Sequence, residues 1–107
     1  MTQDDELEAL LDGVWSRRRT ELLERVAQLR VCLDQAGSDP AAWQEAGAEA
    51  HRLTGALGSL GFDELARRAR AVERLVTADP ARGDVVAARA EVEVLGARLA
   101  AAEERPR

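Results

Sequence analysis

Apolar residues recur along the chain every three or four positions, which is the spacing of one face of a helix. The stripe in the first third of the chain consists of Leu7, Leu11, Trp15, Leu22, Val26, Leu29, Leu33 and Ala36. Arg18 occupies the place between Trp15 and Leu22 where this stripe would continue, and Ser16 or Thr20 could cap a new helix there. We therefore predict a short helix at about 4–14 and a longer one at about 17–36, with a bent continuous helix as the alternative.

Turn-forming residues divide the rest of the chain into three more segments. The segment Gly37-Ser38-Asp39-Pro40 is a clear boundary, because an aspartate can cap a helix that begins at the following proline. Gly61 is placed to end that helix. The apolar periodicity then predicts helices at about 40–59, 62–78 and 84–103.

Amphipathic segments with short connections pack most simply as an antiparallel bundle. We predict one all-α domain over residues 1–107, a four-helix bundle with a short additional N-terminal helical segment. The residues expected to meet in its core are Leu53, Leu57, Leu65, Val72, Val92, Leu95 and Leu99. The heptad spacing of the last segment could instead serve a homodimer, although we expect a monomer.

Composition narrows the class of protein. The 107 residues include no tyrosine or isoleucine, which favours helix over sheet. A single cysteine, Cys32, excludes an intramolecular disulfide and, with only one histidine, a Cys/His zinc site, so we expect no bound metal. A net charge of −5 argues against nucleic-acid binding. The acidic N-terminus and the lack of a long apolar run predict a cytoplasmic protein that does not enter a membrane, and Met1 favours a free-standing one.

The candidate chemistry centres on the only histidine, His51. A helical wheel puts it opposite the alanine and leucine face of its helix, so we expect it to be exposed. Its neighbours on that face are Gln44, Gly47, Ala48, Thr54, Gly55 and Gly58. Each glycine in a helix costs about 1 kcal/mol relative to alanine, and close approach of another protein to the imidazole would explain that cost. The alternatives are that the glycines break the helix or let a neighbouring helix pack tightly.

The run from His51 to Gly61, His-Arg-Leu-Thr-Gly-Ala-Leu-Gly-Ser-Leu-Gly, resembles the signature of histidine phosphotransfer (Hpt) domains, His-x-Leu-Lys-Gly-small-x-x-x-Leu-Gly. The likeness extends through Leu65 to Glu73 and includes the tryptophan-containing first third of the chain. Thr54 replaces the lysine of the signature. The resemblance implies a four-helix bundle, in agreement with the apolar pattern.

The resemblance also implies a function. His51 would accept a phosphoryl group from a phosphoaspartate in the receiver domain of a response regulator or hybrid histidine kinase, and pass it to a second receiver. The receiver supplies Mg²⁺, so the chain itself needs no cofactor or ATP and is a phosphocarrier, not an enzyme. The family's lysine offsets the phosphoryl charge; Thr54 offers only a neutral hydrogen bond, and Arg52 or Arg68 could take its place. The alternatives are a degenerate Hpt-like adaptor that binds a receiver or kinase without phosphotransfer, and a helical dimerisation module unrelated to signalling.

Overall fold

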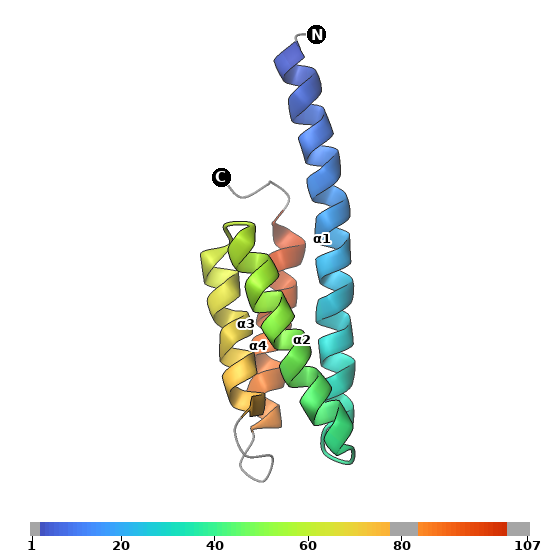
Figure 1. Ribbon diagram of the computed structural model, residues 1–107, viewed down its shortest axis with the longest axis vertical. Helices are drawn as coiled ribbons and strands as arrows, with labels where there is room; N and C mark the ends of the chain where they lie inside the picture. Colours follow the sequence, from blue (N-terminus) through green and yellow to red (C-terminus); the bar gives the residue numbers. More distant parts are fainter. Residues whose placement is uncertain (1–2, 78–83, 103–107) are drawn as a thin grey trace.

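The computed structural model describes residues 3–77 and 84–102, and these form four helices. The helices are α1 (Gln3–Gln35), α2 (Pro40–Ser59), α3 (Asp63–Thr77) and α4 (Val85–Ala101). They run alternately up and down, and each packs on its two neighbours in the bundle (Figure 1). The all-α, antiparallel four-helix class predicted from the sequence is therefore confirmed.

The core lies along the axis of the bundle and receives side chains from all four helices. Every residue predicted for the core belongs to it, and Leu53, Leu57, Leu95 and Leu99 have no exposed surface. The free Cys32 is buried among them, and desolvation raises the pKa of its thiol. None of the described helices is long and apolar enough to cross a membrane.

The predicted break between two N-terminal helices is wrong, because α1 is continuous from Gln3 to Gln35. The hydroxyl of Thr20 donates to the carbonyl of Ser16 one turn earlier (3.1 Å), so neither residue caps a second helix. Arginine is a good helix former, and Arg18 forms an ion pair with Glu21 on the outside of the same helix. The N-terminal part of α1 consequently extends beyond the bundle (Figure 1).

The ends of α2 are built by the residues that the sequence pointed to. The Asp39 side chain accepts a hydrogen bond from the backbone N–H two residues later (2.9 Å), and Pro40 is the first helical residue. At the other end Gly61 has φ 89°, and the N–H of Phe62 reaches the carbonyl of Leu57 (3.0 Å). This is a Schellman termination, which only a left-handed residue permits, and it turns the chain so that α3 packs back along α2.

The helices α3 and α4 each begin one residue later than expected from the sequence. The backbone N–H of Ala87 donates to the side chain of Asp84, which caps α4 (2.8 Å). The positions 78 and 103, where these two helices were expected to end, lie outside the described residues.

Candidate functional site

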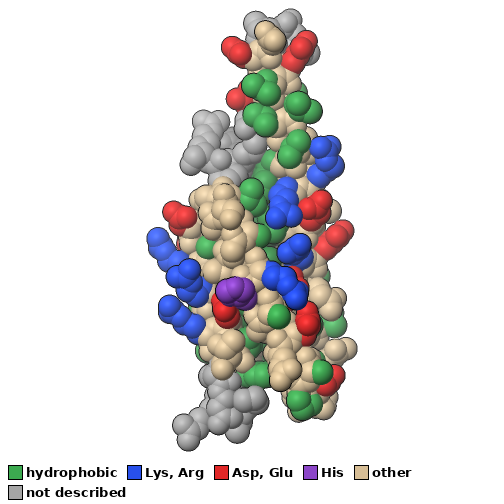
Figure 2. All heavy atoms as spheres, in the orientation of Figure 1, with side chains coloured by type: hydrophobic (Ala, Val, Ile, Leu, Met, Phe, Trp, Pro, Cys, Tyr) green, Lys and Arg blue, Asp and Glu red, His purple; other side chains and the backbone are tan. Residues whose placement is uncertain are grey.

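His51 lies near the middle of α2, and 76% of its side-chain surface is exposed. On the opposite side of the same helix Leu53 and Leu57 are fully buried, as the wheel predicted. Leu60, expected on that side too, is only partly buried, at the C-cap. In Figure 2 the histidine stands on the surface of the bundle with nothing covering it. The ring is therefore open to another molecule while its helix is anchored in the core.

One nitrogen of the ring is held by the neighbouring helix. The Nδ1–H of His51 donates to Oε1 of Glu73 on α3 (2.9 Å). A carboxylate can only accept, so in the neutral ring the proton lies on Nδ1 and the lone pair on Nε2. Nε2 has no hydrogen-bond partner among residues 3–77 and 84–102. The helical wheel of α2 alone could not predict this contact. The signals that could have done so were the residues of α3 that face α2 and the antiparallel direction in which α3 returns along it.

The side of His51 that faces α3 is more buried than expected. Gly47 is buried, and a Cβ atom there would lie 3.4 Å from Cγ2 of Thr77 and 3.6 Å from Cγ2 of Val76. Thr54 is also buried, and its hydroxyl donates to the Ala50 carbonyl (2.8 Å). The expectation that both residues share the open face with His51 is thus wrong, because α3 covers this edge of α2. Gly47 therefore packs against α3, where a Cβ atom would meet the methyl groups of Thr77 and Val76 at ordinary contact distance.

The other neighbours of His51 leave the ring accessible. Gly55 is exposed, and a Cβ atom built on it would meet nothing within 4 Å. Gly58 is exposed as well, and its Cβ would reach only the Cβ of Ala66, at 4.0 Å. Gln44 is exposed and Ala48 is half-buried. Apart from Gln44, these residues are small, and they form a low surface around the imidazole.

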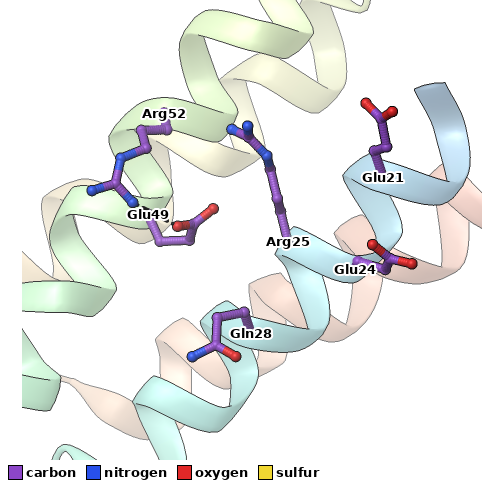
Figure 3. A pocket seen from close by; sticks show the side chains of 6 residues that line it. All are labelled: Glu21, Glu24, Arg25, Gln28, Glu49 and Arg52. Atoms are coloured by element: carbon purple, nitrogen blue, oxygen red, sulfur yellow. Dashed lines mark hydrogen bonds and ion pairs between the residues drawn. The ribbon is translucent and has the colours of Figure 1, made fainter.

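A charged groove of about 580 Å³ adjoins this surface between α1 and α2 (Figure 3). Arg52 donates to Glu49 (2.8 Å) and lies 3.4 Å from Glu45, and these hydrogen bonds raise the pKa of its guanidinium. The charge of Arg52 is therefore already balanced within α2. The groove is lined by Glu21, Glu24, Arg25, Gln28, Glu49 and Arg52.

The comparisons with known proteins agree with this arrangement. The family model described as Hpt domain matches residues 5–105, which is nearly the whole chain. The chain belongs to the Hpt domain family. No curated protein and no solved structure matches it. Hpt domains take part in the phosphorelays of two-component signal transduction, in which they interact with receiver domains.

In this Hpt domain Arg68, the second arginine considered as a replacement for the lysine, makes its contacts away from His51. Arg68 pairs with Glu91 on α4 (3.2 Å) and with Glu64 one turn earlier on α3 (3.6 Å). Its side chain is thereby held at the α3–α4 boundary, away from α2. These ion pairs do not favour Arg68 as a replacement for the lysine of the signature, and the wheel of α3 alone could not tell which neighbouring helix this edge would meet.

Proposed function

We propose that this Hpt domain is a phosphorelay intermediate in which His51 accepts a phosphoryl group from the phosphoaspartate of one receiver domain and passes it to another. The observation that carries the proposal is the geometry of the imidazole. It is 76% exposed, its Nδ1 is engaged by Glu73, and its Nε2 is free of other described residues. An exposed imidazole with one nitrogen held is a positioned nucleophile.

The proposed transfer step uses no cofactor on this chain. The Nε2 lone pair of His51 attacks phosphorus as the bond from phosphorus to the aspartyl oxygen breaks, and the aspartate leaves as a carboxylate. The proton on Nδ1 stays in place, so the phosphorylated ring carries a positive charge. The carboxylate of Glu73, 2.9 Å from Nδ1, stabilises that charge as it develops. In the return step a second receiver's aspartate attacks the same phosphorus, and Nε2 is the leaving atom.

The small residues around the ring give a receiver room to approach. In-line transfer requires the reacting atoms to come within about 3–3.5 Å of one another. The surface formed by Gln44, Ala48, Gly55 and Gly58 has no long side chain next to the imidazole other than Gln44. Arg52 lies at the edge of this surface and is placed to contact the partner rather than the phosphoryl group, because its guanidinium is bound by Glu49. The receiver binds Mg²⁺ itself, and this chain acts as a phosphocarrier without enzyme activity of its own.

A second candidate function is a degenerate Hpt adaptor that binds a receiver or kinase without accepting phosphate. The observation in its favour is Thr54, which brings no positive charge and whose hydroxyl is bonded to its own helix. Both functions use the same exposed face, so only the covalent step separates them.

Incubation with phosphorylated receiver domains from the same genome tests the proposal. We expect acid-labile, base-stable label on the wild-type chain and none on His51→Gln. Because His51 is exposed, the variant should keep the helicity and melting temperature of the wild type. Label on His51→Gln would show that the nucleophile is another residue. Binding of a receiver by an unlabelled wild-type chain would favour the adaptor.

A further inference from the structure

Phosphorylation of His51 would place strong negative charge on a helix, α2, that offers no free positive charge beside the ring. A phosphoryl group carries roughly −1.5 to −2 charges near neutral pH. The Glu73 carboxylate offsets the positive charge of the phosphorylated ring, so the charge of the phosphoryl group itself stays unbalanced. The α2 residues exposed beside His51 are neutral, and Arg52 is already bonded to Glu49 and Glu45. A cation that offsets this charge therefore has to come from another helix.

The contacts between α2 and α3 show which residue of α3 could supply such a cation. Gly47 packs against Thr77, His51 bonds to Glu73, and Gly58 lies against Ala66. These three contacts define one antiparallel register, in which each step forward on α2 is a step backward on α3. Thr54, three residues after His51, therefore lies opposite Arg70, three residues before Glu73.

Arg70 has the properties that the site requires. It is exposed, and it shares a helical face with Glu73 because the two are separated by three residues. Its side chain forms no ion pair or hydrogen bond with any residue in 3–77 or 84–102, whereas Arg68 is held by two carboxylates. Figure 2 shows basic side chains on both sides of the histidine, and all of them are arginines because the chain has no lysine.

The residue between Arg70 and the ring leaves the path open. Thr54 is short, about nine-tenths buried, and its hydroxyl points to the carbonyl of Ala50. No long side chain of α2 stands between position 70 and the outer edge of the imidazole. A guanidinium that reaches across Thr54 can donate two parallel hydrogen bonds to phosphoryl oxygens.

We propose that Arg70 on α3 is the phosphoryl-binding cation of this Hpt domain and stabilises the phosphorylated form of His51. The inference rests on the proposed function, in that it assigns a role in the phosphorylated state of the same histidine. Arg67 and Arg74 are exposed on α3 too. The register puts Arg67 about one turn further than Arg70 from the ring, and Arg74 is rotated further than Arg70 from the side of α3 that faces α2.

The test uses the whole chain labelled at His51 with phosphoramidate, a small phosphoryl donor that needs no receiver. The ³¹P resonance of the phosphohistidine is followed against pH in wild type, Arg70→Gln, Arg70→Lys, and the controls Arg67→Gln and Arg74→Gln. A nearby guanidinium favours the dianion, so the pKa of the phosphoryl group should be higher in Arg70→Gln than in wild type. We expect Arg70→Lys to restore part of the difference and both controls to match wild type.

The same variants are then assayed with saturating phosphorylated receiver. Loss of one charge-assisted contact in Arg70→Gln should slow transfer about tenfold. An unchanged phosphoryl pKa in Arg70→Gln, or a larger change in either control, would overturn the role of Arg70 while leaving the relay function intact. If phosphoramidate labels His51 and no receiver does, the relay function fails and the titration still decides on Arg70. If no donor labels His51, both proposals are wrong.

Discussion

The two flanks of His51 are built from the same kinds of residue and have opposite environments. On the flank toward α3, Gly47 and Thr54 are buried under the neighbouring helix, and Glu73 bonds to the ring. On the flank toward α1, Gly55 faces open space. A small residue thus lies in a packed contact on one flank and beside open space on the other. The composition of a helical face alone does not distinguish these uses.

The difference between the flanks suits the role that we propose for His51, which needs an imidazole that is both fixed and reachable. The covered flank limits motion of the imidazole, because Nδ1 is bonded to a carboxylate on a helix that packs closely through Gly47. The open flank leaves Nε2 and the surface beside Gly55 to a partner. Substitutions on the covered flank should therefore change stability, and substitutions on the open flank should change transfer.

The largest stability effect should come from Gly47→Leu. A leucine there would press against Val76 and Thr77, because a Cβ at position 47 would already lie within 3.6 Å of their methyl groups. Overpacking of this kind costs about 1–3 kcal/mol of unfolding free energy. Urea denaturation of Gly47→Leu, with Gly55→Leu as the matched control, measures it. Equal stability of the two variants would remove the distinction between the flanks.

The position of His51 could be predicted from sequence because it depends on one helix. The alanines and leucines of α2 set its buried face, and Asp39, Pro40 and Gly61 set its ends. The contact with Glu73 could not be derived from that wheel, because it depends on how α3 packs after the turn at Gly61.

The burial of Gly47 and Thr54 could not be predicted for the same reason. The wheel of α2 places both beside His51, but it contains no information about the helix that covers this edge. The continuity of α1 has a local explanation instead. Residues able to cap a helix also fit within one when a hydroxyl bonds to the preceding turn, as Thr20 does to Ser16.

On the open flank, Gly55→Gln should separate function from stability. A glutamine at this position would fold, because nothing lies within 4 Å of its Cβ and glutamine is a better helix former than glycine. Its side chain would hold a receiver away from the imidazole, and we expect transfer to fall at least about tenfold. Gly55→Ala is the control, and it should stabilise the helix by up to about 1 kcal/mol with near-normal transfer.

Two results would contradict this view of Gly55. Transfer at the wild-type rate in Gly55→Gln would show that the glycine is not needed for access. Unfolding of the same variant would show that position 55 is packed in the same way as position 47. Thermal melts and single-turnover transfer with one receiver preparation distinguish the two outcomes.

The smallest effect should come from Thr54→Val, on the covered flank next to the ring. The Thr54 hydroxyl is occupied by the carbonyl of Ala50 (2.8 Å) and the residue is about nine-tenths buried, so it is not directed at a phosphoryl group on His51. Valine has nearly the same shape and loses only a bond within the helix, so the stability should change by less than about 1 kcal/mol. Transfer should stay within about twofold of wild type, since no contact to the phosphoryl group is removed. Thr54→Ser, which keeps the hydroxyl, is the control. Slow transfer in the valine variant alone would mean that the hydroxyl leaves the Ala50 carbonyl and binds the phosphoryl group. The covered flank would then contribute to the chemistry directly.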